Sequence, residues 1–268
     1  GDVLHSGPRS GSVAMASFFR FARAVTRLAP LVLASGNHDV RGGVDALDAV
    51  AEALGGRGVH RVRPGETVSA GGALFHCVRG TWDSRAAEEA HPAPGDPPAA
   101  GPLYVLCHDS VRELPWAAAG SVAARIAARS VADVVSCARA TGPGPGVAGV
   151  LLGDNHRPGS GVCPETGVLW ANPGSLVQQT FGEAWDGHGF FVWDGGPPVF
   201  VEAPNPWARV TIDPVPGWGL CVRGGPPGRP VPASEAPCHA RVRCTADAAD
   251  VWAALEDQGL APTSVVQV

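Results

Sequence analysis

Apolar positions recur along the chain with two different spacings, and each spacing predicts a type of element. Residues 12–28 and 44–54 carry apolar side chains at helical spacing, which is typical of amphipathic helices that bury one face. Three short apolar runs predict buried strands because polar or turn-forming residues follow each directly; they are 31–34, 103–107 and 147–152. Helices that alternate with such strands favour an α/β fold.

The same patterns predict further elements. Residues 121–139 are expected to form a long helix, and the Pro-, Gly- and Ala-rich residues 91–102 are expected to form a surface loop. Gly189–Trp193 and Val199–Glu202 predict a hairpin, because a turn sequence of Asp and Gly separates two strand-like runs. Shorter strands are expected at 59–63, 73–79 and 168–171.

The pattern changes after about residue 204. From there the chain is predicted to hold strands at 207–213 and 239–245, Pro- and Gly-rich turns between them at 214–237, and a helix at 247–258. We therefore expect two domains, a main domain over residues 1–203 and a small α+β appendage over residues 204–268.

Composition narrows the class of protein. With 268 residues, of which 45 % are apolar and 17 % charged, the chain can bury a sizeable core, and no apolar run is long enough to cross a bilayer. Its 7 cysteines are scattered and form no Cys-x-x-Cys pair, so we expect a soluble protein of the reducing cytoplasm. The net charge of −5 argues against a generally basic surface for nucleic acid. All 20 basic residues are Arg, so a local groove lined by Arg stays compatible with the sequence.

Polar residues with metal-binding chemistry directly follow the predicted strands. They are Asn37-His38, His108 and Asp154-Asn155-His156, and the sequence also opens on Asp2 with His5 close behind. Because loops at the carboxyl ends of strands in an α/β fold converge on one crevice, we expect these side chains to meet. Carboxylate, imidazole and amide groups together suit Mn²⁺, Fe²⁺ or Zn²⁺. A carboxylate that bridges two such ions is typical of phosphate-ester hydrolysis.

The order of these motifs resembles that of the calcineurin-like metallophosphoesterase superfamily. The likeness spans residues 1 to about 203 and rests on Gly1-Asp2-Val3-Leu4-His5, Gly36-Asn37-His38-Asp39, His108 and Gly153-Asp154-Asn155-His156. A closer likeness is to SbcD-type DNA repair exonuclease subunits, through Ser6-Gly7-Pro8-Arg9-Ser10, Asn172-Pro173-Gly174-Ser175 followed by Glu183, and the small appendage. The resemblance implies a two-sheet β-sandwich core flanked by helices, with two metal ions, usually manganese.

The resemblance also implies a set of metal ligands. Asp2 would bridge the two ions, and His156 would hold the first ion. Asn37 and His108 would hold the second ion through an amide oxygen and an imidazole. Asp154 stands where the family's Gly-His-x-His motif has a histidine, and a carboxylate can replace that imidazole as a harder, charged ligand of the second ion. The family's first Asp-x-His motif would lie upstream of this sequence, so we expect the stretch alone to be a poor catalyst.

Other residues are implied to act on the phosphate. His38 would lie over the scissile phosphate and help to protonate the leaving oxygen, and His5 is similar to a histidine near that phosphate in the repair nucleases. Asp39 is expected to orient the loop or a histidine. Arg157 and Arg9 are the candidates for holding the DNA backbone, although a surface Arg157 paired with a carboxylate is an equally good interpretation.

The expected function is that of a metal-dependent phosphodiester hydrolase, a DNA repair exonuclease subunit in which water activated by two metal ions attacks the phosphate. By resemblance its partners are DNA, an SbcC-type coiled-coil ATPase and a second copy in a homodimer, without a membrane. Two alternatives stay open. The same fold serves phosphodiesterases and phosphatases of small substrates, and a chain without a competent metal centre would be a scaffold.

Overall fold

The computed structural model describes most of the first 204 residues and four strands beyond them. The described residues are 13–41, 44–56, 58–81, 101–114, 129–143, 146–177, 183 and 187–204, and, for the backbone alone, 208–215, 219–223, 238–242 and 262–267. Contacts divide the chain into two units, which we describe separately. Unit 1 covers residues 1–155, 159–172 and 193–198, and unit 2 covers residues 156–158, 173–192 and 199–268.

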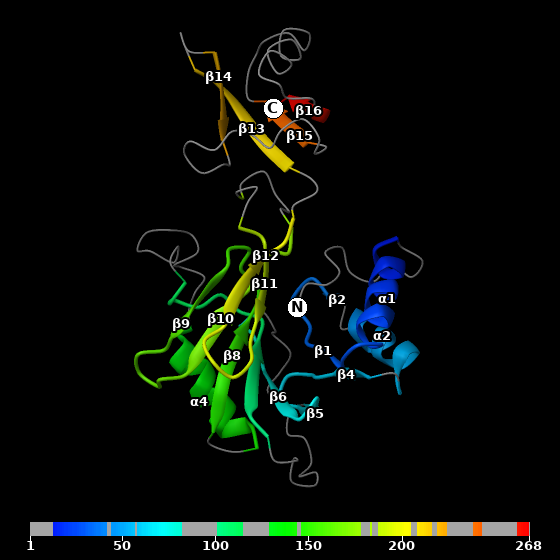
Figure 1. The fold of residues 1–268 in the computed structure, drawn as a ribbon, viewed down its shortest axis with the longest axis vertical. Coiled ribbons are helices and arrows are strands. Elements are labelled where there is room, and N and C mark those ends of the chain that lie inside the picture. The colour runs from blue at the N-terminus through cyan, green and yellow to red at the C-terminus, as the bar shows by residue number, and fades with distance from the viewer. Residues whose placement is uncertain are drawn as a thin grey trace. The chain divides into compact units, whose positions relative to one another are not determined.

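A six-stranded mixed sheet is the largest sheet of unit 1 (Figure 1). Its strands follow the order β5 (Thr67–Ala70), β6 (Ala73–Val78), β7 (Leu103–Cys107), β8 (Val147–Leu152), β10 (Leu169–Asn172) and β9 (Gly159–Val162). The four inner strands are parallel, and they confirm the strands predicted from apolar runs. The edge strands β5 and β9 pair antiparallel and were not predicted, because short edge strands with Gly, Ser and Thr bury little apolar surface.

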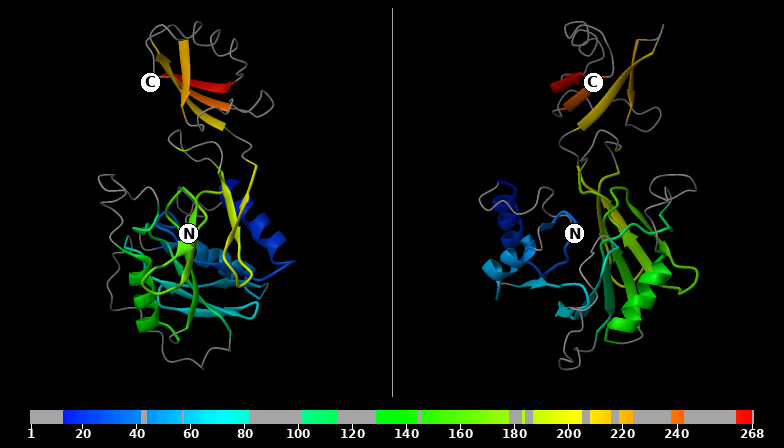
Figure 2. Two further views of the ribbon diagram at one scale, coloured as in Figure 1. Left: turned by 60° about the vertical axis from the view of Figure 1, so that its left-hand side comes forward. Right: turned by 180° about the vertical axis from the view of Figure 1, so that it is seen from behind.

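Helix α4 (Val131–Thr141) packs against β6, β7 and β8, where its buried valines join the main apolar core (Figures 1 and 2). The prediction of a continuous helix over 121–139 is wrong at its described part, because Arg129 lies in a β-bridge and Ser130 caps the helix. The Ser130 hydroxyl accepts a hydrogen bond from the backbone N–H of Asp133, and the Asp133 carboxylate accepts one from the backbone N–H of Ser130. This reciprocal pair satisfies two amide groups that a helix start leaves without partners, so it fixes the first turn here.

A second, smaller core of unit 1 surrounds a two-stranded parallel sheet. Strands β1 (Leu31–Leu33) and β4 (Val59–Arg61) form this sheet, and β2 (Val40–Arg41) and β3 (Val44–Asp45) form a short antiparallel pair. Helices α1 (Val13–Val25) and α2 (Ala46–Leu54) supply most of the apolar side chains of this core. The predicted helices and strands of this region are confirmed, with ends displaced by a few residues. Helix α2 begins later than expected because the Asp45 carboxylate accepts a hydrogen bond from Leu47 N and caps it.

Unit 2 contains a hairpin and a four-stranded sheet (Figures 1 and 2). The hairpin pairs β11 (Gly189–Val192) with β12 (Val199–Glu202), which confirms the predicted hairpin. The sheet has the order β14 (Gly219–Arg223), β13 (Ala208–Val215), β15 (Cys238–Val242) and β16 (Pro262–Gln267). The expectation of turns throughout 214–237 is wrong, because five residues between Pro- and Gly-rich stretches pair with β13 as β14. The predicted helix over 247–258 lies outside the described residues.

The described elements make an α/β protein with mixed sheets and few helices. None of the helices in the described ranges is long and apolar enough to span a membrane. The predicted loop over 91–102 falls largely on residues that the structure does not describe. The predicted division of the sequence after residue 203 stays a prediction.

Candidate metal-binding site

Two parallel strands of the six-stranded sheet bring predicted site residues to the same edge. Strand β7 ends at Cys107 and β8 ends at Leu152, and these two residues face each other in the strand register. His108 and Asp154 follow these ends in the sequence, so they start from neighbouring points at the carboxyl end of the sheet. Asn37 reaches the same place from the loop that follows β1.

Three of the predicted ligands lie together in unit 1, and we call Asn37, His108 and Asp154 the His108 site. His108 Nε2 lies 3.1 Å from Asn37 Oδ1 and 3.8 Å from Asp154 Oδ1. The His108 side chain is only 5 % exposed, whereas that of Asp154 is 31 % exposed and Asn37 is exposed, so the imidazole lies beneath two more accessible oxygen donors. These distances bring together three of the residues that were expected to meet, Asn37, His108 and Asp154.

The His108 ring is held by close packing against the main chain. A Cβ added at Gly153 would lie 2.6 Å from His108 Nδ1, so no larger residue fits there without moving the ring. Gly153 N in turn donates a 3.0 Å hydrogen bond to Cys107 O, which ties the start of the loop after β8 to the end of the neighbouring strand β7. Asp109, which follows His108 in the sequence, is buried. Its carboxylate accepts hydrogen bonds from the backbone N–H and the hydroxyl of Thr81 at 2.9 and 2.7 Å.

Asp154 is held by its backbone conformation and by a serine that the sequence did not single out. Its φ of 75° lies in the left-handed region, which Asp tolerates better than most residues. Ser110 Oγ donates a 2.6 Å hydrogen bond to Asp154 Oδ2, and Asn155 Nδ2 donates one of 3.3 Å to Ser110 Oγ. Ser110 therefore orients the carboxylate and leaves Asp154 Oδ1 directed at His108.

A buried ion pair between Arg61 and Asp45 lies next to the segment that leads into the Asn37 loop. Arg61 Nη2 lies 2.5 Å from Asp45 Oδ2, with both side chains about 5 % exposed, and Arg61 Nη1 donates to Leu33 O at 3.1 Å. The Asp39 carboxylate is buried and accepts a 3.0 Å hydrogen bond from Gly36 N. Asp39 thus orients the loop around Asn37, which is one of the two roles expected for it.

A separate cluster in unit 2 surrounds His156, and we call His156, Glu183, Ser175 and His188 the His156 cluster. His156 Nδ1 lies 2.8 Å from Glu183 Oε1, and Ser175 Oγ donates to Glu183 Oε2 at 3.1 Å. His188 Nδ1 lies 3.0 Å from Ser175 O and 3.1 Å from Ser175 Oγ. The His156 side chain is 41 % exposed, whereas that of Glu183 is 10 % exposed. Glu183 was named above only as part of the likeness to SbcD-type subunits, and its contact with His156 was not predicted.

The other predicted residues are less informative. His38 and Arg157 are exposed in the described structure, next to Asn37 and His156 in the chain. Asp2, His5 and Arg9 lie outside the described residues. The metal-bridging role implied for Asp2, the catalytic roles implied for His38 and His5, and the DNA-binding roles implied for Arg157 and Arg9 therefore stay predictions.

The donor atoms of the His108 site suit a divalent ion. Within the part of the chain that the structure describes, no three His, Cys, Asp or Glu side chains gather as a metal site. The His108 site supplies one imidazole, one carboxylate and the amide oxygen of Asn37, a mixed N/O set suited to Mn²⁺ or Zn²⁺. Ligands about 2.1 Å from one ion lie about 3–3.5 Å apart. The 3.1 Å between Asn37 Oδ1 and His108 Nε2 has this spacing, and the 3.8 Å to Asp154 is slightly wider.

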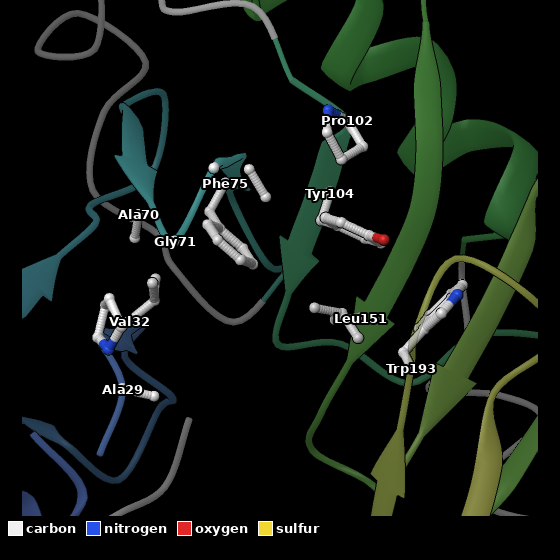
Figure 3. Close-up of a pocket in the computed structure, with 12 residues that line it drawn as sticks. Ala29, Val32, Ala70, Gly71, Phe75, Pro102, Tyr104, Leu151 and Trp193 are labelled. Carbon is white, nitrogen blue, oxygen red and sulfur yellow. The ribbon is translucent and has the colours of Figure 1, made fainter.

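Unit 1 also contains an apolar cavity of about 470 Å³ (Figure 3). Figure 3 shows Phe75, Tyr104 and Leu151 around it, with Trp193 across from Tyr104. The Tyr104 and Trp193 rings pack edge to face with centroids 5.6 Å apart. None of the predicted site residues lines this cavity, and its apolar walls offer no charged group to a phosphate.

Comparison with known proteins gives no relative from which a function can be transferred. No family model matches the chain. No curated protein matches its sequence either. Function therefore has to be inferred from the residues and their geometry.

Proposed function

We propose that the chain is a metal-dependent phosphodiester hydrolase with a metallophosphoesterase fold, and that it acts as an SbcD-type DNA repair exonuclease subunit. The observation that carries the proposal is the His108 site. The amide oxygen of Asn37 and the carboxylate of Asp154, from two separate loops, lie 3.1 and 3.8 Å from Nε2 of His108, which follows a strand of the six-stranded sheet. This is the donor set that the resemblance implies for the second metal ion.

Each ligand is assigned from chemistry that its side chain can supply. Asn37 Oδ1 and His108 Nε2 would hold the second ion together with Asp154, whose negative charge adds to the electrostatic attraction. Asp2 would be the carboxylate shared by two ions, and His156 would hold the first ion through Nε2, because its Nδ1 is bonded to Glu183. When bound, two Mn²⁺ ions would acidify a water molecule and neutralise the phosphate oxygens.

The residues beside the ligands act on the substrate. His38, exposed next to Asn37, would protonate the leaving oxygen, and its charged form would stabilise the negative charge that develops on the phosphate. His5 would contact the same phosphate. Arg157, exposed next to His156, and Arg9 would bind the DNA backbone, because a guanidinium matches two phosphate oxygens at once.

The compartment and the partners of the chain are also part of the proposal. The chain would work in the cytoplasm with an SbcC-type coiled-coil ATPase, and it would form a homodimer. These partners follow from the resemblance of the motifs, and the His108 site is compatible with them.

Hydrolysis assays with Mn²⁺ on two substrates test the proposal. The chain is expected to cleave linear duplex DNA in preference to bis-p-nitrophenyl phosphate, even if slowly. His38→Ala should lower the rate about 100-fold or more, because a general acid contributes at least that much. His60→Ala, which removes a half-buried histidine on β4, is the matched control and should leave the rate unchanged.

Three outcomes would contradict the proposal in different ways. Cleavage of the small ester alone would point to a small-substrate phosphodiesterase. Absence of both cleavage and Mn²⁺ binding would point to a scaffold. Equal rates for His38→Ala and the unchanged chain would remove His38 from the mechanism.

A further inference from the structure

The His156 cluster has a feature that the proposed ligand set does not include. Glu183 is almost buried, yet one of its carboxylate oxygens contacts a histidine that is 41 % exposed. Burial of a carboxylate is costly unless its oxygens accept hydrogen bonds, so this arrangement needs a reason. Both carboxylate oxygens of Glu183 have a partner. Oε1 lies 2.8 Å from His156 Nδ1, and Oε2 accepts a 3.1 Å hydrogen bond from Ser175 Oγ.

We infer that Glu183 is a positioning residue for metal binding, which sets the tautomer and the orientation of the His156 ring. The inference rests on the proposed function, because it assumes that His156 is a ligand of the first ion. An ionised carboxylate only accepts hydrogen bonds, so Nδ1 of a neutral His156 must carry the proton. Nε2 then bears the lone pair. The ring therefore presents its metal-binding nitrogen away from Glu183.

The main chain of Gly174 and Ser175, next to the Glu183 carboxylate's partner hydroxyl, lies close to that of His156. Ser175 N donates a 3.1 Å hydrogen bond to His156 O, which ties the two segments of unit 2 together. Gly174 has a φ of 72°, and a Cβ there would lie 2.7 Å from His156 O. Only glycine combines this backbone conformation with so close an approach. Ser175, whose hydroxyl donates to Glu183, is thus held close to the main chain of His156.

Ser175 links the carboxylate to the second histidine of the cluster. Its hydroxyl carries one proton, which is best placed on the charged Glu183 oxygen at 3.1 Å and not on His156 O at 3.4 Å. The Nδ1 proton of His188 then goes to Ser175 O at 3.0 Å or to the lone pair of Ser175 Oγ at 3.1 Å. The buried His188 therefore supports Ser175, and Ser175 supports Glu183. Each donor in this series of hydrogen bonds therefore has an acceptor.

A purely structural ion pair would look similar in coordinates but would behave differently. If the contact between His156 and the almost buried Glu183 served only stability, removing it would lower the free energy of unfolding and leave the affinity for Mn²⁺ unchanged. A positioning carboxylate changes the properties of the ring itself. The tautomer in the metal-free protein and the affinity for Mn²⁺ separate these two roles.

The test uses the full chain with three substitutions: Glu183→Ala, Glu183→Gln and Glu202→Ala. Glu202 is an exposed glutamate of the same unit and serves as the matched control. Nitrogen-15 NMR of the histidine rings at pH 8, without metal, reports which ring nitrogen of His156 carries the proton. Titration with Mn²⁺, followed by the electron paramagnetic resonance signal of free Mn²⁺, reports affinity. Circular dichroism checks that each variant is folded.

The unchanged chain should show His156 protonated at Nδ1. Glu183→Ala should shift the ring towards the Nε2-protonated tautomer and weaken Mn²⁺ binding about 10- to 100-fold, the usual effect of losing the partner of a ligand histidine. Glu183→Gln should restore much of both properties, because its amide oxygen still accepts from Nδ1. Glu202→Ala should change neither.

Two results would overturn the inference and can be told apart from failure of the proposed function. If Glu183→Ala folds and leaves both the tautomer and the Mn²⁺ affinity unchanged, Glu183 does not position His156. If the tautomer shifts in Glu183→Ala but the unchanged chain binds no Mn²⁺, the carboxylate orients the ring while the proposed metal function is wrong, and the assignment to metal binding fails with it.

Discussion

The His108 site and the His156 cluster hold an imidazole ring in two different ways. The His108 side chain is 5 % exposed and packs closely against Gly153 at the carboxyl end of the parallel strands β7 and β8. Packing therefore determines the orientation of its ring. The His156 side chain is 41 % exposed, and the carboxylate of Glu183 is the polar partner described for its ring. A buried ring is sensitive to added volume, whereas an exposed ring is sensitive to the loss of one hydrogen bond. The two rings are therefore expected to respond to different kinds of mutation.

The largest effect on the packed site is expected from Gly153→Ala. The added Cβ would lie 2.6 Å from His108 Nδ1, so the ring must move away from Asn37 and Asp154. We expect the free energy of unfolding to fall by about 1–3 kcal/mol, as for other overpacked sites. Mn²⁺ affinity should fall with it. Urea unfolding and Mn²⁺ titration measure the two effects.

Gly146→Ala is the matched control for this change. Gly146 has no atom within 4 Å of an added Cβ and no positive φ, so the substitution should be nearly neutral. If Gly153→Ala proved as mild as Gly146→Ala, the ring of His108 would not be held by packing, and the contrast between the two sites would fail.

Ser110→Ala should have a smaller effect that sharpens the comparison. It removes the 2.6 Å hydrogen bond to Asp154 Oδ2 but leaves the packing of His108 against Gly153 intact. We expect about a tenfold loss of Mn²⁺ affinity, at the lower end of the range for residues that orient ligands. The NMR signals of the His108 ring should stay in place. A displaced His108 ring in Ser110→Ala would mean that hydrogen bonds, and not packing, fix this site as well.

The smallest effect concerns His76, a buried histidine outside both sites. Thr141 Oγ1 donates to Cys137 O, so it accepts from His76 Nε2 at 2.9 Å, while Thr67 Oγ1 donates to His76 Nδ1 at 2.9 Å. Burial lowers the pKa of His76 below its ordinary 6.5 and favours this neutral form.

The unfolded chain therefore takes up the proton of His76 first as the pH falls below 6.5, and the folded state loses stability. One proton accounts for at most about 1.4 kcal/mol per pH unit, and the neutral variant His76→Gln should show a flatter dependence. Urea unfolding at pH 7.5 and pH 5.5 compares the two chains. Parallel curves would mean that His76 does not titrate on unfolding in this range.

The sequence predicted what depends on periodicity and on general rules of sheet topology. The apolar runs that became β7 and β8 are short and continuous, and parallel neighbours put their carboxyl ends at one edge. That rule accounts for the approach of Asp154 to His108, whereas Asn37 follows β1 of the separate two-stranded sheet, so its contact with His108 depends on how the two sheets pack. The inner strands and the hairpin were predicted for the same reason.

The sequence could not predict contacts that depend on side-chain packing. Ser110 is an ordinary serine in a loop, and only the fold shows that its hydroxyl reaches Asp154. The contact of Glu183 with His156 spans 27 residues, and it is accompanied by close packing of Gly174 against the main chain of His156 that no sequence pattern signals. The start of α4 was predicted wrongly because the helical spacing of apolar residues continues across Ser130. The hydrogen bonds between Ser130 and Asp133 instead begin the helix there.

The most direct test of the account is Mn²⁺ binding to the full chain with and without His108. Free Mn²⁺ is measured by electron paramagnetic resonance for the unchanged chain, His108→Ala and the control His60→Ala. We expect saturable binding by the unchanged chain and by His60→Ala, and binding about 100-fold or more weaker in His108→Ala, since it loses a ligand and not only the partner of one. Equal binding by His108→Ala and the unchanged chain would contradict the central claim that Asn37, His108 and Asp154 form a metal site.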